Sequence, residues 1–227
     1  MTVPTTGTLP SDIMRAISRE EMADLAIGRY EGDVCLVRTI RDCERALEDF
    51  CQEQFVGFDT ETRPSFRAGD RHSPCLIQAA TARAVYLFRL LQESDFHVPA
   101  ELIARPDTLK VGIGLTDDIR ALKLLHPFED RSLLDLAVVA RHWGLGQTGM
   151  RNLAGIFLKV RIPKSTKTSN WAAPKLSVAQ IHYAATDAWI CRELFLRFRY
   201  LGMIPEAGTL EKPPSQDIME CPESVRE

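Results

Sequence analysis

The sequence lacks the features that would place it in a membrane, in a secreted scaffold or in a zinc-binding ribbon. Its 227 residues contain no apolar run approaching the roughly 18 residues of a membrane-spanning helix. The N-terminus, MTVPTTGTLPSD, has neither the charged start nor the apolar core of a signal peptide. The six cysteines are scattered without a CxxC pair, which is typical of free thiols in a reducing compartment. We therefore expect a cytoplasmic protein that does not bind membranes.

The sequence also has little net charge, but its charges are unevenly distributed. Lys and Arg number 28 and Asp and Glu number 31, so the formal charge is −3, which at face value disfavours a polyanionic partner. Between Leu136 and Thr186, however, there are seven basic residues and no acidic one. Residues 203–227 contain six acids, two bases and four prolines, which predicts a disordered acidic tail. The average therefore conceals a basic stretch and does not exclude a nucleic acid.

Strand-like and helix-like segments alternate, which predicts an α/β domain over residues 33–202. Residues 1–32 form an extension with a short helix over 12–27, for which Asp12 is a candidate N-cap. A tight turn at Ala82-Arg83 joins two of the strands, which favours a mixed sheet. Strands are expected at 33–39, 54–61, 74–81, 84–90 and 107–114, and helices at 41–53, 116–126, 131–143, 151–159 and 176–202.

An acidic pair follows the apolar segment FVGF. Asp59 and Glu61 are two residues apart on a predicted strand, so their side chains point to the same side. Two carboxylates on one side of a strand end suit a hard cation such as Mg²⁺ or Mn²⁺. Taken alone, such a pair is more often a solvated strand end.

Two further groups carry acids at helical positions. Asp118 follows the strand 107–114, and Asp117 is the adjacent alternative. An acid at a helix start is commonly a cap. Tyr183 and Asp187 are four residues apart on a predicted helix, which places both side chains on one face. A hydrogen bond between a buried tyrosine and a carboxylate explains this pair equally well.

The order of the three groups carries more information than any one of them. The segments VGFDTE, CLIQAAT, KVGIGLTDDIRAL and KTSNWAAPKLSVAQIHYAATDAW resemble the DEDD exonuclease superfamily in its tyrosine-containing DEDDy branch. The sequence is similar to ribonuclease D and to the exonuclease domain of the Werner-syndrome helicase over about residues 33–202. This resemblance implies a ribonuclease-H-like α/β fold, in which helices flank a mixed five-stranded sheet.

The resemblance also implies a reaction. Asp59, Glu61, Asp118 and Asp187 match the family's metal-binding acids, and Tyr183 matches the tyrosine that orients the attacking water. Four carboxylates can hold two divalent cations, Mg²⁺ or Mn²⁺, about 3.5–4 Å apart around the scissile phosphodiester. The implied activity is a 3′-5′ exonuclease that removes nucleoside 5′-monophosphates from the 3′ ends of single-stranded nucleic acid. We favour RNA over DNA as the substrate.

The resemblance and the basic stretch together suggest which residues contact the substrate. In the family, main chain and apolar side chains after the first acidic motif contact the terminal nucleotide. The segment RIPKSTKTSNWAAPK mixes bases with Ser, Thr and Asn, all of which donate hydrogen bonds to phosphate. The predicted nucleic-acid contacts are Thr60, Phe66, Lys164, Lys167, Ser169 and Asn170.

Two other functions stay open. The first is a non-catalytic nucleic-acid-binding module of the same fold, in which one of the acids would be missing, although all are present here. The second is a hydrolase of short oligoribonucleotides. The related family with that activity typically has histidine in place of Tyr183.

Overall fold

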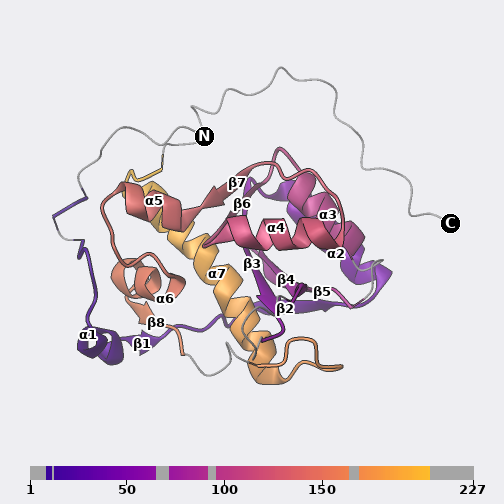
Figure 1. The fold of residues 1–227 in the computed structure, drawn as a ribbon, viewed down its shortest axis with the longest axis horizontal. Helices are drawn as coiled ribbons and strands as arrows, with labels where there is room; N and C mark the ends of the chain where they lie inside the picture. The colour runs from indigo at the N-terminus through magenta and orange to yellow at the C-terminus, as the bar shows by residue number, and fades with distance from the viewer. Residues whose placement is uncertain (1–8, 12, 65–71, 92–95, 164–168, 205–227) are drawn as a thin grey trace, which may run out of the picture.

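The computed structural model describes residues 9–11, 13–64, 72–91, 96–163 and 169–204. A mixed sheet of six strands lies at the centre, and helices cover both of its faces (Figure 1). The strand order is β2-β5-β4-β3-β6-β7, and β4 runs antiparallel to β3 and β5 while the other pairs are parallel. The strands are β2 (Asp33–Val37), β3 (Phe55–Thr62), β4 (Pro74–Ala80), β5 (Ala84–Arg89), β6 (Leu109–Gly112) and β7 (Leu133–Asp135). The predicted mixed α/β architecture is confirmed.

The helices form two layers around this sheet. On one face, a buried cluster that includes Phe50, Phe58 and Tyr86 packs against α2, α3 and α4. On the other face, the long α7 and the shorter α5 pack against two further clusters. The helices are α1 (Arg19–Asp24), α2 (Ile40–Gln52), α3 (His97–Ala104), α4 (Leu115–Leu125), α5 (Leu136–His142), α6 (Met150–Leu153) and α7 (Val178–Tyr200). A π-helical segment, Ala154–Leu158, continues α6.

The sixth strand corrects the prediction of a five-stranded sheet and a helix over 131–143. Residues Leu133–Asp135 form β7, which pairs in parallel with β6, and the helix α5 begins only at Leu136. The side chain of Asp135 accepts a hydrogen bond from the backbone N–H of Ala137 at 2.8 Å and so caps α5. The pairing of β7 with β6 and the cap at Asp135 together explain why the helix begins at Leu136 and not at residue 131.

The N-terminal extension differs most from prediction. In place of the helix expected over 12–27, the structure has only the shorter helix α1. Ser18 and Glu21 form a capping box, which starts this helix at Arg19. After α1 the chain forms a short strand, β1 (Ala26–Ile27), which pairs in parallel with β8 (Val160–Arg161). Asp12, the predicted cap, lies outside the described residues. Three apolar residues before α1 are buried in the cluster beneath α7: Leu9, Ile13 and Ile17.

The close packing of α7 on β3 fixes the geometry of the site described below. The predicted helix over 176–202 is confirmed, and Ser177 is its N-cap in a reciprocal capping box with Gln180. On β3, a Cβ at Gly57 would lie 2.0 Å from the carbonyl oxygen of Ala188. Because glycine has no side chain, the backbone of α7 can lie directly on the strand that carries the first acidic pair.

In the part of the chain that the structure describes, no helix combines the length and the hydrophobicity that crossing a bilayer requires. The predicted acidic tail begins at Met203 and Ile204, which are both buried. Its remaining residues, 205–227, lie outside the described residues.

Candidate active site

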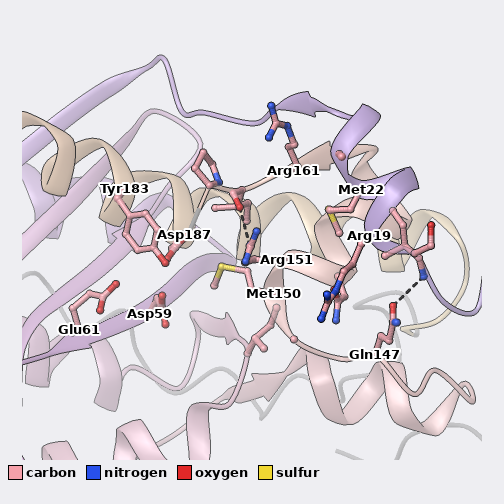
Figure 2. Close-up of a pocket in the computed structure, with 18 of the residues that line it drawn as sticks. Arg19, Met22, Asp59, Glu61, Gln147, Met150, Arg151, Arg161, Tyr183 and Asp187 are labelled. Carbon is pink, nitrogen blue, oxygen red and sulfur yellow. Dashed lines mark hydrogen bonds between the residues drawn. The ribbon is translucent and has the colours of Figure 1, made fainter. Parts of the chain in front are cut away.

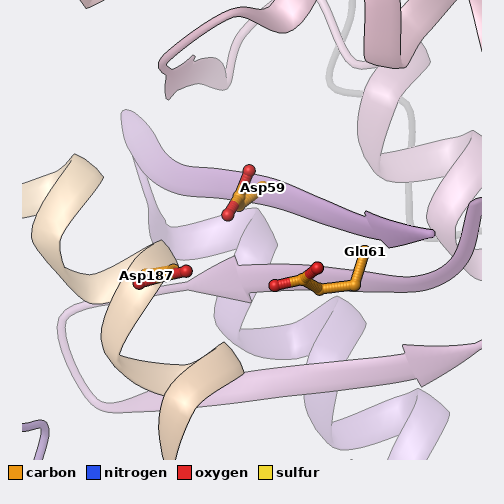
Figure 3. Close-up of side chains that lie close together, drawn as sticks. All are labelled: Asp59, Glu61 and Asp187. Carbon is orange, nitrogen blue, oxygen red and sulfur yellow. The ribbon is translucent and has the colours of Figure 1, made fainter. Parts of the chain in front are cut away.

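Carboxylates from a strand and a helix meet on the α7 face of the sheet. Asp59 and Glu61 project from the same side of β3, as predicted, and Asp187 approaches them from α7 (Figure 3). One carboxylate oxygen from each of the three lies within 4.8 Å of the others. Oxygen donors at this spacing are the ligands that hard divalent cations prefer.

The surroundings of Asp59 disfavour its ionised carboxylate when no cation is bound. Burial raises the pKa of the Asp59 carboxyl well above its ordinary value, and the neighbouring carboxylates, Asp187 first, raise it further. Asp187 itself is only 4% exposed. A bound cation reverses this effect, because its charge favours the ionised carboxylates. The donor set therefore fits a divalent metal.

Tyr183 lies one helical turn before Asp187 and lines the same cavity (Figure 2). Burial raises the pKa of its hydroxyl, and the charges of Asp187 and Glu61 and a side-chain hydrogen bond with Asp187 raise it further. The hydroxyl therefore stays protonated at neutral pH. Such a group can orient a water molecule but is a poor general base.

Asp118 joins the site from the opposite face of β3. It lies in the first turn of α4, and its Oδ1 accepts a hydrogen bond from the Thr60 hydroxyl at 2.8 Å. Burial raises the pKa of Asp118 to about 6, while the Thr60 hydrogen bond lowers it. Asp118 is not one of the three acids whose oxygens lie within 4.8 Å of one another, but its charge does raise the pKa of Asp59.

The structure distinguishes the two adjacent acids that the sequence left as alternatives. Asp118 lines the cavity together with the β3 acids. Asp117 is exposed and forms an ion pair with Arg120 at 3.2 Å, one helical turn away. Asp118 is therefore the member of the pair that lines the cavity.

Asp59, Glu61 and Asp187 lie at one end of a cavity of about 1040 Å³ (Figure 2). This volume is at the upper limit of small-molecule pockets, which are roughly 300–1,000 Å³, so the cavity has room for a chain-like ligand. Figure 2 shows Glu61 and Tyr183 at one end, Met150 and Arg151 in the middle, and Arg19 at the other end.

The structure places the predicted nucleic-acid contacts unevenly. Thr60 lines the cavity. Phe66, Lys164 and Lys167 lie outside the described residues. Ser169 and Asn170 are not among the lining residues, and both hold a loop in place. The Ser169 hydroxyl and the Asn170 carbonyl accept hydrogen bonds from the Gln180 side chain at 3.2 Å and 3.1 Å.

Other cavity residues were not predicted from the sequence. Arg151 and Arg161 belong to the seven basic residues of the acid-free stretch, although they are not among the six predicted nucleic-acid contacts. Arg19 and Met22 lie in the N-terminal extension, where no sequence pattern indicates a substrate contact.

A model of the 3′-5′ exonuclease family matches residues 36–201. The chain belongs to the 3′-5′ exonuclease family. It is 33% identical over 159 residues to ribonuclease D of Haemophilus influenzae, a match that covers 66% of this chain and 38% of that protein. This chain spans less than half the length of the first curated relatives that it matches.

Solved structures confirm the fold. The Nibbler EXO domain of Aedes aegypti is 25% identical, with a TM-score of 0.67 over 77% of this chain and 92% of that domain. Trypanosoma brucei RNase D, solved in complex with RNA U12, is 18% identical, with a TM-score of 0.64 over 81% of this chain and 65% of that one. The predicted ribonuclease-H-like α/β fold and the predicted membership in the exonuclease superfamily are thus both confirmed.

Proposed function

We propose that this exonuclease domain removes nucleotides from the 3′ end of single-stranded nucleic acid and releases nucleoside 5′-monophosphates. The convergence of four carboxylates on one cavity carries the proposal. Asp59 and Glu61 from β3 and Asp187 from α7 supply oxygens within 4.8 Å of one another. Asp118 from α4 lines the same cavity, and its charge acts on Asp59. When the 3′ end of a nucleic-acid strand lies in this cavity, its last phosphodiester is beside the acids.

In this proposal, Asp59, Glu61, Asp118 and Asp187 hold two divalent cations, Mg²⁺ or Mn²⁺. When bound, the cations offset the charge of the scissile phosphate and lower the pKa of the attacking water. Tyr183 keeps its proton and orients that water through its hydroxyl. The Thr60 hydroxyl fixes the carboxylate of Asp118 by the hydrogen bond at 2.8 Å.

We favour RNA as the substrate. Two relatives support this choice: the Haemophilus protein is named ribonuclease D, and the Trypanosoma brucei RNase D structure contains RNA. We place the catalytic domain at residues 33–202, close to the family match at 36–201, with 1–32 as an extension and 203–227 as a tail. A cytoplasmic location and substrate contacts from Phe66, Lys164, Lys167, Ser169 and Asn170 stay predictions.

The test is a parallel digestion of labelled single-stranded RNA, single-stranded DNA and recessed duplex in Mg²⁺ and in Mn²⁺. The wild-type protein should release mononucleotides from the 3′ end, RNA fastest, and a chelator should stop the release. Asp59→Asn should lower the rate at least about 100-fold, because cation catalysis contributes several kcal/mol. Asp107→Asn, at an exposed loop aspartate, is the matched control and should leave the rate unchanged.

Three results would contradict the proposal. Binding of the strand without turnover in either metal indicates a non-catalytic binding module. Much faster cleavage of dinucleotides than of long strands indicates a short-oligoribonucleotide hydrolase. Full activity of Asp59→Asn excludes the acid cluster as the catalytic centre.

A further inference from the structure

A segment that precedes the family match forms the far wall of the cavity. The match begins at residue 36, whereas the cavity is lined also by Ile17, Arg19 and Met22. In Figure 2, Arg19 and Met22 lie on α1, at the end of the cavity away from Glu61 and Tyr183. The N-terminal segment therefore shapes a site whose chemistry lies on the family domain.

Long-range contacts hold this wall in place. The backbone N–H of Ile17 donates to Oε1 of Gln147 at 2.9 Å, and Ile17 itself is buried. Immediately after α1, β1 pairs in parallel with β8. Nε of Arg161 on β8 donates to the carbonyl oxygen of Leu25 at 3.0 Å. These contacts on both sides of α1 fix its position relative to the acids.

From its middle to the end opposite the acids, the cavity wall is basic. Three arginines, Arg19 on α1, Arg151 on α6 and Arg161 on β8, line the cavity, and we refer to them as the arginine wall. Within the described ranges, none of the three forms an ion pair with a carboxylate. Nε of Arg151 donates to the carbonyl oxygen of Ile162 at 2.8 Å, which fixes the guanidinium against the wall. An arginine has further N–H donors beyond the one used in such an anchor.

The distribution of acidic and basic side chains along the cavity matches a nucleic-acid strand that enters with its 3′ end first. The acids at one end suit the cations and the last phosphodiester, whereas the phosphates that precede it need cationic donors. Met22 and Met150 also line the cavity, Met150 near Asp59 and Met22 beside Arg19 (Figure 2). Methionine side chains adapt to ligands of different shape, so they can contact bases without selecting among them.

We propose that α1, through Arg19, forms with Arg151 and Arg161 a subsite for the phosphates immediately 5′ of the nucleotide being removed. This inference rests on the proposed exonuclease function and adds to it a preference for strand length. A chain of several nucleotides reaches the arginine wall, whereas a dinucleotide is held only at the acids. The N-terminal segment is thus a substrate-binding part of the enzyme.

The test compares Arg19→Glu with Arg41→Glu, which makes the same charge change at an exposed position of α2, on the other face of the sheet. The measured quantity is the ratio of kcat/KM for a single strand of about 12 nucleotides to kcat/KM for a dinucleotide. Arg19→Glu should lower this ratio about tenfold, and its dependence on salt should become shallower by about one phosphate contact. Arg41→Glu should match the wild type in both. An unchanged ratio in Arg19→Glu overturns the inference.

A binding measurement separates failure of this inference from failure of the proposed function. Fluorescence anisotropy of the labelled strand in chelator, where no hydrolysis occurs, should show weaker binding by Arg19→Glu than by Arg41→Glu. A wild type that releases no nucleotide contradicts the exonuclease proposal, and the binding difference then still tests the arginine wall. Equal binding by the two variants overturns the proposed phosphate subsite at the arginine wall. Circular dichroism melting of both variants verifies that they are folded.

Discussion

Gly57 of β3 lies directly beneath Ala188 of α7, so closely that a Cβ at Gly57 would lie 2.0 Å from the Ala188 carbonyl oxygen. Gly57 and Asp59 point to the same face of β3, and Ala188 adjoins Asp187. The contact between the two backbones therefore sets how closely the carboxylates of Asp59 and Asp187 approach each other.

Gly57→Ala should accordingly separate the two acids. The added methyl cannot be accommodated by a side-chain movement, because its nearest neighbour is backbone, so α7 must shift away from β3. We expect a loss of about 1–3 kcal/mol in the free energy of unfolding. We also expect a larger loss of nuclease activity than the unfolded fraction explains. Urea denaturation and initial rates, measured on the same preparation, provide the two numbers.

Gly146→Ala is the matched control, because no heavy atom lies within 4 Å of a Cβ added at Gly146. It should keep both stability and activity. A Gly57→Ala protein with wild-type activity would show that the approach of α7 to β3 does not control the acid cluster.

The Thr60 hydroxyl provides a second test, because its hydrogen bond to Asp118 at 2.8 Å joins α4 to β3 at the residue between Asp59 and Glu61. Thr60→Val keeps the shape of the side chain and removes the donor. We expect the Mg²⁺ concentration for half-maximal activity to rise about 10-fold or more, since residues that orient ligands typically contribute 10–100-fold to metal affinity.

Thr60→Ser restores the hydroxyl and should bring the metal requirement back toward that of the wild type. If Thr60→Val and Thr60→Ser need the same metal concentration, the hydrogen bond does not orient Asp118 toward a cation.

The adjacent acids of α4 permit a comparison within one helical turn. Asp118 is half-buried and lines the cavity, whereas the Asp117 side chain is 89% exposed and pairs with Arg120. Asp118→Asn should lower kcat at least about 100-fold, because it removes a negative charge from the cation site. Asp117→Asn should have little effect, since an exposed ion pair contributes about 0–1 kcal/mol. The reverse ranking would assign the second acidic motif to Asp117.

The sequence predicted the relative directions of the acids well, because two local periodicities determine them. The period of two along a strand places Asp59 and Glu61 on one side, and the helical period places Tyr183 and Asp187 on one face. Their convergence from separate elements could be expected only from the resemblance to a family. Their catalytic roles stay predictions.

The parts that sequence reasoning missed depend on long-range contacts. Arg19 lines the cavity because β1 pairs with β8, and the two strands are more than a hundred residues apart. The helix expected over 12–27 is shorter, because Ile13 and Ile17 are buried in the cluster beneath α7 before α1 begins. β7 was missed because a strand of three residues is too short for an alternating pattern to identify it.

Lys110 on β6 is fully buried away from the acid cluster. Its contribution to the free energy of unfolding therefore depends on pH. Burial, and next the charge of Arg105, lowers the pKa of Lys110 to about 8 from an ordinary value of 10.5, although its Nζ donates to the Arg105 carbonyl oxygen at 2.7 Å. Between these two pH values, the unfolded chain binds one more proton at this residue than the folded protein does. The free energy of unfolding therefore gains a contribution that rises with pH through this window.

Lys110→Met removes the titrating group and nearly preserves the length of the side chain. The free energy of unfolding of the variant minus that of the wild type should be most positive below pH 8. It should decline by on the order of 3 kcal/mol as the pH approaches 10.5, since one pKa unit corresponds to about 1.4 kcal/mol. Urea denaturation from pH 7 to 10 measures this difference, in which titration of the cysteines and tyrosines common to both proteins cancels. If the two stability curves run parallel over this range, Lys110 keeps an ordinary pKa, and its ammonium is solvated in the folded protein.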